Sequence, residues 1–344
     1  MWKSFINNIK TDLKCRSIGV LNLESSDFSI FSFNLKKKFD KVLKSMPEYV
    51  KNTLAERSDP RTIYPWAKSV IVCAVPFNLI PEVDDFLPKA QDNTLLYGAI
   101  AGYAARLDYH RFAVNFGNAI IDELKKYVVD QNLIMEQQTQ FEICVDTKPI
   151  AEKPMAEYAN VGKTAANHLL QTAGAAADSF LMEIFTNIKI PDIKEKTQIL
   201  SCGSCGKCFS ACPSGALGGA GEFDYDLCVS SITMEKRGVL NNDERKMLNH
   251  WIFGCDLCAT SCPGSKLPPV YNADLRWLLS ASASDVKKKI ALTPLNYAGV
   301  TLLRRNALAV LGNIANDQAY QLIKEFSKKT QSAVLKAMAD EIIQ

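Results

Sequence analysis

The chain has 344 residues, of which 47% are hydrophobic and 22% are charged, and its formal net charge at pH 7 is +3. This composition is ordinary for a globular protein with two or three packed units, and the small net charge says little about partners. Three histidines exclude a histidine-rich metal site, and no apolar run reaches the roughly 18 residues of a membrane-spanning helix. No signal peptide is recognisable, so we expect a cytoplasmic protein in a reducing compartment.

The first predicted elements are helices followed by a buried strand. Residues 1 to 60 look helical and peripheral, because apolar residues recur at helical spacing with lysines on the other face, namely Leu35, Phe39, Val42, Leu43 and Met46. The run from Ser69 to Val75 is short, apolar and β-branched, and Pro76 follows it. It predicts a strand that is buried on both faces.

The next predicted elements are a long helix, a second strand and a set of C-terminal helices. A helix is predicted over 97–128, and its early small residues permit close approach of a backbone or a large ligand, with tight helix packing as the alternative. Phe141 to Val145 predicts a strand that ends at Asp146. An aspartate there suits catalysis in a mixed α/β fold, and a turn-forming aspartate is equally common. Short helices are predicted over 302–311, 318–326 and 332–343, and their apolar faces must stack as in α-solenoids.

Eight of the eleven cysteines lie between Cys202 and Cys262. They begin as a C-x₂-C-x₂-C-x₃-C-P run, which is typical of two [4Fe–4S] clusters because the fourth cysteine ligates the other cluster. This crossed pattern assigns one set of ligands to one cluster, namely Cys202, Cys205, Cys208 and Cys262. It assigns the remaining set to the second cluster, namely Cys212, Cys228, Cys255 and Cys258.

Zinc and disulfides are the rival interpretations of these cysteines. Zinc ribbons favour paired C-x₂-C knuckles with longer spacers and no closing Cys-Pro, and a reducing compartment disfavours disulfides. The other three cysteines, Cys15, Cys73 and Cys144, stand among apolar residues, so we expect them to be inert parts of the core.

Four short basic clusters lie at residues 36–38, 287–289, 304–305 and 328–329. The ordinary interpretation of each is a solvated helix face. Arg304, Arg305 and the lysine pairs of the C-terminal helices are also the residues that would offer a positive surface to nucleic-acid phosphates.

The sequence resembles the epoxyqueuosine reductases, cobalamin-dependent enzymes that act on transfer RNA and are related to reductive dehalogenases. The resemblance is closest from Cys202 to Cys262, where the residues after Cys228 and those from Asn249 to Cys258 follow the family's pattern. It extends to shorter motifs at 59–60, 67–71, 103–110, 145–149, 183–184 and 303–313. Together these motifs cover most of residues 55 to 315.

The resemblance implies an enzyme that reduces epoxyqueuosine to queuosine at the wobble position of the anticodon, with cobalamin and two [4Fe–4S] clusters as cofactors. It implies that Asp146 is the acid that protonates the opening epoxide, which requires a desolvated site beside the corrin. It also implies a set of cobalamin contacts, namely Arg57, Tyr109, Asp146, Asn167, Ser230, Arg237, Cys255 and Asp256. The cluster bearing Cys255 and Cys258 should lie nearest the corrin, and the other should accept electrons from an external donor of the flavodoxin or ferredoxin type.

The fold expected from this resemblance is α+β and has three regions. Residues 1–195 should form a mixed α/β cobalamin-binding core, residues 196–270 an inserted ferredoxin-like domain with two clusters, and residues 271–344 HEAT-like helical repeats that bind the tRNA anticodon stem-loop. We expect a monomer with no membrane partner.

This chain departs from the family's pattern in two places. Between residues 160 and 180 only Gly162 and Asn167 stay in register, and alanines at 175–177 replace an expected Gly-Ser. After Cys228, Ser231 and Lys236 replace an expected tyrosine and histidine. These positions would hold the substrate or the edge of the corrin. Two other functions therefore stay open: a cobalamin-dependent reductase of a small molecule, and an iron–sulfur electron-transfer protein without a catalytic corrin.

Overall fold

The computed structural model describes residues 1–42, 48–91, 95–133, 138–172, 174–194, 202–203, 205–219 and 222–344. The contacts within the chain divide it into two units that interleave along the sequence. The first unit contains Met1–Leu79, His110–Cys205 and Pro263–Lys266, and the second contains Ile80–Tyr109, Gly206–Cys262 and Leu267–Gln344. The expected division into three functional regions follows the linear sequence instead, and it stays a prediction.

The first unit is built on a four-stranded antiparallel sheet of order β1-β2-β8-β4. Its strands are β1 (Ser17–Asn22), β2 (Ser69–Pro76), β8 (Ser179–Thr186) and β4 (Phe141–Cys144). All eight residues of β2 are buried, which confirms the strand predicted from its continuous apolar run. Residues 1 to 60 are mainly helical, as expected, but the expectation that they are peripheral is wrong at β1, because its residues are buried and pair with β2 in the sheet.

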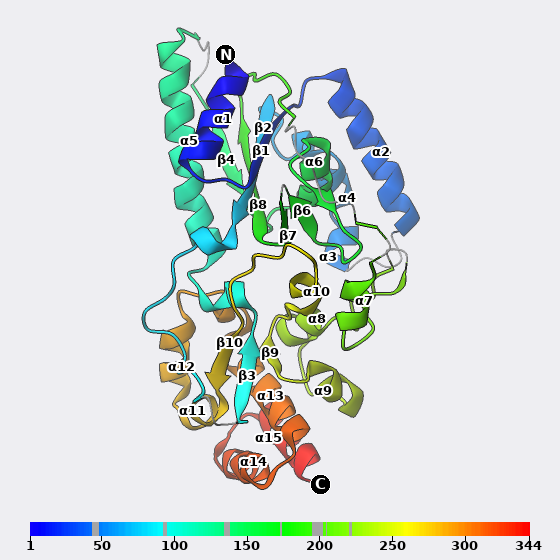
Figure 1. Cartoon of the computed structure of the whole chain (residues 1–344), viewed down its shortest axis with the longest axis vertical. Coiled ribbons are helices and arrows are strands. Elements are labelled where there is room, and N and C mark those ends of the chain that lie inside the picture. Colours follow the sequence, from blue (N-terminus) through cyan, green and yellow to red (C-terminus); the bar gives the residue numbers. More distant parts are fainter. Residues whose placement is uncertain are drawn as a thin grey trace. The chain divides into compact units, whose positions relative to one another are not determined.

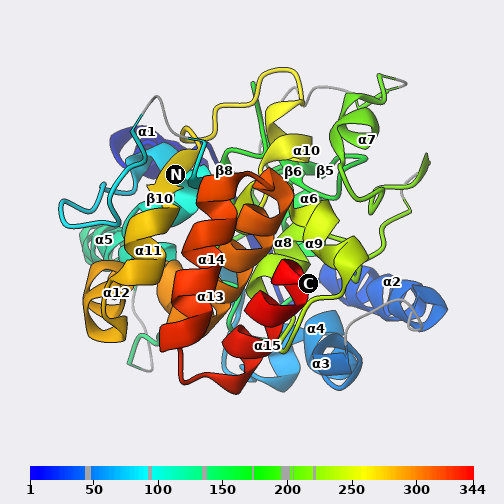
Figure 2. The same ribbon diagram turned by 90° about the horizontal axis from the view of Figure 1, so that it is seen from below.

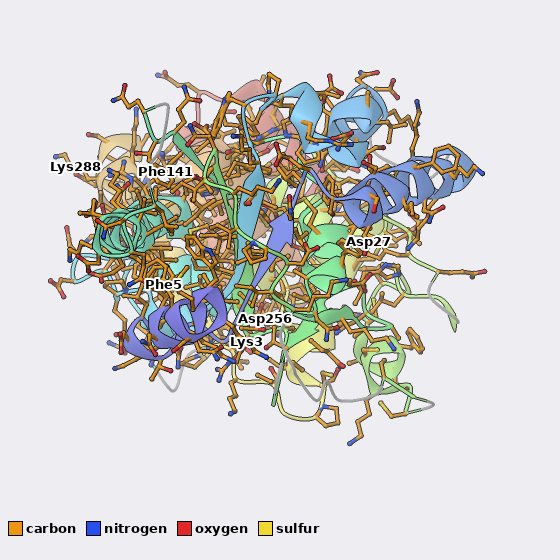
Figure 3. All side chains as sticks on the ribbon, turned by 90° about the horizontal axis from the view of Figure 1, so that it is seen from above. Lys3, Phe5, Asp27, Phe141, Asp256 and Lys288 are labelled. Carbon is orange, nitrogen blue, oxygen red and sulfur yellow. The ribbon has the colours of Figure 1, made fainter. Side chains whose placement is uncertain are left out.

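Helices cover both faces of this sheet (Figure 1). The helices α1 (Trp2–Asp12) and α5 (Tyr109–Asp130) lie on one face. There Phe5, labelled in Figure 3, stacks on Tyr127 with 4.1 Å between ring centroids. The other face packs against α2 (Ser26–Val42) and α6 (Glu152–Tyr158), and α4 (Leu54–Ser58) packs against α2. Of the residues that predicted α2, Leu35, Phe39 and Val42 belong to it, whereas Leu43 and Met46 lie outside the described residues. The predicted core cysteines Cys15, Cys73 and Cys144 are all buried.

Two smaller features complete the first unit. A three-stranded sheet of order β5-β6-β7 is formed by β5 (Lys163–Thr164), β6 (Leu170–Thr172) and β7 (Ala175–Ala176). A short helix, α3 (Glu48–Lys51), precedes α4.

The second unit contains a three-stranded sheet where a helix had been expected. The strand β3 (Tyr97–Ile100) lies between β10 (Tyr271–Asp274) and β9 (Trp251–Phe253), and the helix predicted from residue 97 begins only at Tyr109. The small residues do allow close approach, but within a sheet: a Cβ added at Gly98 would lie 2.7 Å from the Ile252 side chain. Short apolar runs of this kind fit a strand and a buried helix equally well.

The C-terminal helices of the second unit confirm the prediction. They are α11 (Leu275–Ser280), α12 (Ala283–Ile290), α13 (Leu295–Ile314), α14 (Asp317–Lys329) and α15 (Ala333–Ile343). Asn316 and Ser332 cap the N-termini of α14 and α15 with side-chain hydrogen bonds. The helices α13, α14 and α15 pack together (Figure 2), and their apolar faces form one core with β3, β9 and β10. Within the described residues no helix is long and apolar enough to cross a membrane.

Candidate active site and cluster ligands

Asp146 lies on a sharp turn at the end of β4. Its φ is +37°, in the left-handed region that few residues other than glycine adopt. The chain reverses there, since the Thr147 amide donates a hydrogen bond to the Val145 carbonyl. Aspartate tolerates this conformation better than most side chains, yet such backbone positions cost on the order of 1–3 kcal/mol and often occur at functional sites.

The Asp146 carboxylate is paired with a histidine from the first turn of α5. The distance between His110 Nε2 and Asp146 Oδ1 is 2.7 Å, and the two residues are 36 positions apart in the sequence. The Asp146 side chain is 49% exposed and that of His110 is 35% exposed. The described residues alone therefore do not form the desolvated site that was expected around Asp146. The contact does fix the orientation of the carboxyl group and gives it a partner that can exchange a proton with it.

A second carboxyl group fixes the backbone of the same turn. Glu152, in the first turn of α6, accepts a hydrogen bond from the Asp146 amide at 2.6 Å. Burial raises the pKa of Glu152 to about 7, against the lowering effect of this hydrogen bond, and the charge of Asp146 raises it further. Arg57 acts in the opposite direction on the pKa of Glu152 through its positive charge.

The predicted contact Arg57 is anchored in the first unit. Its Nε donates to Thr53 Oγ1 at 3.0 Å and its Nη1 to the Ile150 carbonyl at 3.3 Å. The guanidinium also lies 5.8 Å from the centroid of the Tyr49 ring. These contacts hold the positive charge near the start of α6.

The segment from Asn167 to Asp178, where the sequence departs from the family's pattern, buries many polar side chains. Asn167, Gln171, Thr172 and Asp178 are each at most 6% exposed. Arg16 pairs with Asp178 at 2.5 Å. The hydroxyl groups of Thr172 and Ser265 are buried without a hydrogen-bond partner among the described residues. Buried hydroxyl groups normally have partners, so this polar segment fits a ligand with polar groups at its edge.

The second unit gathers the thiols of the second predicted cluster. Burial raises the pKa of Cys258 to about 12, and the charges of Cys228, Cys212 and Cys208 raise it further. Burial likewise raises the pKa of Cys255 to about 12, with added effects from Cys258 and Cys228. These thiols therefore lie close enough to act on one another, and as thiolates they would need compensating positive charge. Iron supplies that charge, because a coordinating thiol is deprotonated by the metal it binds.

The grouping of these thiols differs from a site for a single ion. Among the described residues no three His, Cys, Asp or Glu side chains are arranged to hold one metal ion. A four-iron cluster is wider than one ion and takes one thiolate at each iron. The other predicted set takes Cys202 and Cys205 from the first unit and Cys208 and Cys262 from the second, and it stays a prediction.

Backbone amides are directed at one of the ligand sulfurs. Burial acts to raise the pKa of Cys212, but hydrogen bonds from the backbone of Leu217, Ser214 and Ala216 and from the Ser214 side chain lower it overall. In the first unit, the Ala166 amide donates to Cys202 Sγ at 3.2 Å. Such N–H···S bonds are a principal means by which proteins set cluster reduction potentials.

The C-terminal helix α13 braces the two segments that carry Cys228 and Cys255. These are α8 (Val229–Met234), which follows Cys228, and β9, which precedes Cys255. Asn306 donates to the Thr233 carbonyl at 2.9 Å and to the Ile252 carbonyl at 2.8 Å. The Thr233 hydroxyl in turn accepts from the Gly254 amide at 3.0 Å. The position of the ligand loops therefore depends on a helix some fifty residues later in the chain.

The two arginines of the 304–305 cluster are structural, so the expectation that they form a solvated face or a phosphate surface is wrong. Arg305 is 1% exposed and donates to the carbonyls of Ile232, Lys236 and Gly238. Arg304 donates to the carbonyls of Leu278 and Ala281. Free carbonyls at helix ends attract such cations, which is why both charges turn inward.

The remaining predicted cobalamin contacts lie in the second unit. Asp256 is 6% exposed, and its Oδ2 accepts from the Gly102 amide at 2.7 Å; burial raises its pKa. Ser230 donates to Met234 Sδ at 3.4 Å, and Arg237 Nη1 lies 3.5 Å from the Ala298 carbonyl. Tyr109 stands edge-on to Tyr103 with 6.1 Å between centroids. Because Arg57, Asp146 and Asn167 belong to the first unit, a single pocket for all these residues stays a prediction.

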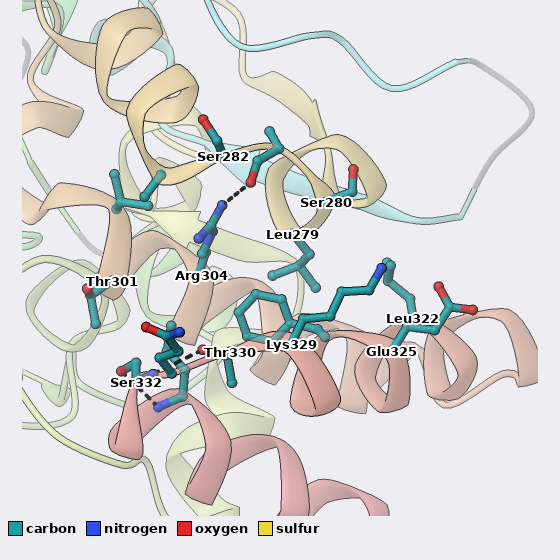
Figure 4. Close-up of a pocket in the computed structure, with 16 residues that line it drawn as sticks. Leu279, Ser280, Ser282, Thr301, Arg304, Leu322, Glu325, Lys329, Thr330 and Ser332 are labelled. Carbon is teal, nitrogen blue, oxygen red and sulfur yellow. Dashed lines mark hydrogen bonds between the residues drawn. The ribbon is translucent and has the colours of Figure 1, made fainter.

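A cavity of about 430 Å³ lies among the C-terminal helices of the second unit (Figure 4). Arg304, Glu325 and Lys329 line it, and Arg304 is turned toward the Ala281 carbonyl. Arg304 and Lys329 belong to the basic clusters predicted from the sequence, but none of the predicted cluster ligands or cobalamin contacts lines this cavity. It therefore contributes nothing to the assignment of the site.

Sequence reasoning gave no role to three residues around Asp146. These are His110, Glu152 and Glu183, of which Glu183 is a fully buried acid in β8. A usable signal was present for Glu183, because it is the only ionisable residue within the otherwise apolar run from Phe180 to Phe185. For His110 the signal was its rarity, since the chain has three histidines.

Two family models match the chain. Residues 57–147 match the model described as epoxyqueuosine reductase QueG, DUF1730, and residues 201–265 match the 4Fe-4S double cluster binding domain. Among curated proteins, the epoxyqueuosine reductase of Aliivibrio fischeri is 26% identical over 335 residues, covering 92% of this chain and 85% of the relative. That of Bacillus subtilis is 27% identical over 299 residues, covering 83% and 73%.

Solved structures share the fold. An epoxyqueuosine reductase crystallised with a tRNA-Tyr epoxyqueuosine-modified stem loop matches 99% of this chain and 88% of that chain, with a TM-score of 0.80 and 24% identity. The Bacillus subtilis enzyme, solved with its catalytic aspartate loop swung out of the active site, matches with the same coverage, a TM-score of 0.78 and 23% identity. The mixed α and β fold of this chain is thus the fold of these structures.

Proposed function

This chain belongs to the epoxyqueuosine reductase family, and from this premise we propose that it reduces epoxyqueuosine to queuosine at the wobble position of tRNA. The observation that carries the proposal is the combination of a double-cluster segment at 201–265 with an aspartate on a left-handed turn at the end of β4. The double-cluster segment would transfer electrons, and the aspartate would act as the acid. The Bacillus subtilis enzyme also carries a catalytic aspartate on a loop, which supports the assignment of the loop at Asp146 here.

The proposed cluster ligands are the eight cysteines between Cys202 and Cys262. One [4Fe–4S] cluster would bind Cys212, Cys228, Cys255 and Cys258, whose mutual influence in the second unit supports this set. The other would bind Cys202, Cys205, Cys208 and Cys262. We assign electron entry to the cluster that would bind Cys202. We assign electron transfer to the reaction centre to the cluster that would bind Cys255. An external donor of the flavodoxin or ferredoxin type would supply the electrons.

The proposed second cofactor is cobalamin. Its edge carries amide groups, which suits the buried polar segment around Thr172 and Ser265. The residues proposed to hold it are Arg57, Tyr109, Asn167, Ser230, Arg237, Cys255 and Asp256. When bound, it would supply a low-valent cobalt centre that is a strong nucleophile and reductant.

The proton chemistry falls to Asp146 and His110. Opening of the epoxide places negative charge on its oxygen, and an acid within reach of that oxygen lowers the barrier. Asp146 gives the oxygen its proton, and His110, 2.7 Å from the carboxylate, is placed to return one. The complete reaction takes up two electrons and two protons and releases the oxygen as water. The protein therefore has to deliver two protons for each turnover.

The proposed partner is the anticodon stem-loop of a tRNA. The solved complex of a relative with such a stem loop supports this partner. In this chain the exposed basic residues left for phosphate contact include Lys287, Lys288, Lys328 and Lys329, since Arg304 and Arg305 face inward. Lys288 is labelled in Figure 3. We propose further that the protein acts as a cytoplasmic monomer, with the cobalamin core, ferredoxin-like and HEAT-like regions in the order expected from the sequence.

A small-molecule substrate is the second candidate. It is favoured by the departures from the family's pattern between residues 160 and 180, which include the buried pair Ala175 and Ala176. The two functions are separated by expressing the chain in cells that lack epoxyqueuosine reductase and analysing the tRNA nucleosides by mass spectrometry. We expect queuosine to reappear. Accumulation of epoxyqueuosine despite soluble, cluster-loaded protein would favour the small-molecule function.

A further inference from the structure

Glu183 is an acid buried inside the main sheet of the first unit. It stands in β8 between Val72 of β2 and Cys144 of β4. Because side chains alternate along a strand, Glu183 points to the same face as Leu181 and Phe185, which belong to the apolar core against α6. It is 0% exposed, and neither carboxyl oxygen has a hydrogen-bond partner among the described residues.

A carboxylate without water or partners is unfavourable, so Glu183 must carry a proton. Burial raises the pKa of Glu183 well above its ordinary value, and the negative charge of Glu152 and an interaction with the Glu152 side chain raise it further, so the two carboxyl groups are neighbours. Two thiols also feel the charge of Glu183: burial raises the pKa of Cys144 to about 12, and a hydrogen bond with Cys15 together with burial raises that of Cys73, so both thiols stay neutral. Arg57, Lys153 and Asp146 act on Glu152. Glu152 is thus the charged neighbour with which Glu183 interacts.

We propose that Glu183 is a positioning residue for Asp146: it keeps its proton and directs it to Glu152, whose carboxylate accepts the Asp146 amide. The inference rests on the proposed function in one respect, namely that Asp146 is the acid. Glu152 is the link, since its Oε1 lies 2.6 Å from the Asp146 nitrogen. Above about pH 7 a proton held on Glu183 leaves Glu152 ionised, and an ionised carboxylate is the stronger acceptor for that amide. The uncommon φ of Asp146 is thereby held in place from inside the sheet.

The test compares two substitutions of the buried acid. Glu183→Gln keeps a hydrogen-bond donor and the side-chain volume, whereas Glu183→Met keeps only the volume. Glu142→Gln is the matched control, because Glu142 is on the neighbouring strand β4 with its side chain 37% exposed and pairs with Lys148 on the surface. Each variant is made in the full chain.

The first readout is amide hydrogen exchange of the peptide spanning residues 145–148, measured without substrate. We expect Glu183→Met to speed exchange there about tenfold and Glu183→Gln to stay within about twofold of the parent. In the loaded enzyme, Glu183→Met should lower kcat about tenfold with unchanged cobalamin and iron content. If Glu183 had only a structural role, Glu183→Met would stabilise the sheet, because an apolar side chain would replace a buried acid, and amide exchange at residues 145–148 would not change.

The second readout is infrared difference spectroscopy between pH 5 and pH 8. We expect a protonated-acid carbonyl band that persists at pH 8, disappears in Glu183→Gln and remains in Glu142→Gln. This measurement needs no turnover and no Met variant, so it tests whether Glu183 keeps its proton even if that variant fails to fold or the proposed function is wrong. The inference is overturned if the band is absent from the parent, or if Glu183→Met leaves exchange at 145–148 unchanged.

Discussion

Asn306→Ala tests whether the C-terminal helix α13 holds the cluster loops. Asn306 is 0% exposed, and its amide donates to the Thr233 and Ile252 carbonyls while its oxygen accepts from Arg305 at 2.7 Å. Truncation leaves two buried carbonyls and part of a buried guanidinium without partners. Each such group costs about 1–3 kcal/mol, so with partial relaxation we expect a loss of about 4 kcal/mol. That corresponds to a fall in Tm of roughly 5 °C for a protein of this size.

Asn313→Ala is the matched control for this prediction. Asn313 is on the same helix and also donates to two backbone carbonyls, those of Arg245 at 2.7 Å and Asn249 at 3.0 Å, but it is exposed. Water can replace its hydrogen bonds, so we expect a loss of about 1 kcal/mol or less. The assay is anaerobic thermal unfolding followed by circular dichroism, with the iron content of each variant measured beside it. Equal losses in the two variants would refute the bracing role of α13, and so would full stability of Asn306→Ala.

Four further predictions follow from the geometry. Asp146→Asn should retain iron and cobalamin yet lose turnover by at least about a hundredfold in single-turnover assays, because the amide cannot donate the acid's proton; retained turnover would remove Asp146 from the mechanism. Cys258→Ser should lose about half of the iron and sulfide, measured chemically after anaerobic reconstitution, whereas Cys15→Ser in the core should keep both clusters. Gly254→Ala should destabilise the chain by about 2 kcal/mol in urea unfolding, since φ is +68° and the new Cβ would lie 2.7 Å from Ala101, while Gly219→Ala, with open space around it, should not. Glu152→Gln should flatten the pH dependence of the free energy of unfolding. The folded pKa of Glu152, about 7, is above the unfolded value, so the stabilising contribution of this group is fully present below about pH 4.5 and is lost as the pH rises through 7. The slope is at most about 1.4 kcal/mol per pH unit, and an unchanged slope in the variant would contradict the assignment.

Local patterns in the sequence predicted those features whose physical cause is local. The buried strand β2 follows from a continuous β-branched run, and the C-terminal helices follow from their periodic apolar faces. The double-cluster segment follows from cysteine spacing, because a cubane imposes that spacing on a short loop, and the match of residues 201–265 to a 4Fe-4S double cluster binding domain agrees with it. The turn at Asp146 was visible as a carboxylate at the end of a predicted strand.

Features that depend on distant contacts were missed. The contact between His110 and Asp146 joins residues that α5 and β4 bring together in space, and nothing in either local sequence signals it. Residues 97–100 were predicted as helix because four small or apolar residues fit a strand and a helix equally well. Only the close packing of Gly98 against Ile252, which is distant in the sequence, distinguishes the two. Arg305 read as surface because arginine is seldom buried, and only the carbonyls at the end of α8 explain its burial.

The measurement that tests the account most directly is a single turnover of epoxyqueuosine-containing tRNA by the purified chain. The protein is loaded anaerobically with iron, sulfide and cobalamin and reduced, and the tRNA nucleosides are then analysed by mass spectrometry. The account predicts conversion of epoxyqueuosine to queuosine that requires cobalamin and both clusters. Unchanged epoxyqueuosine with fully loaded and reduced protein would contradict it.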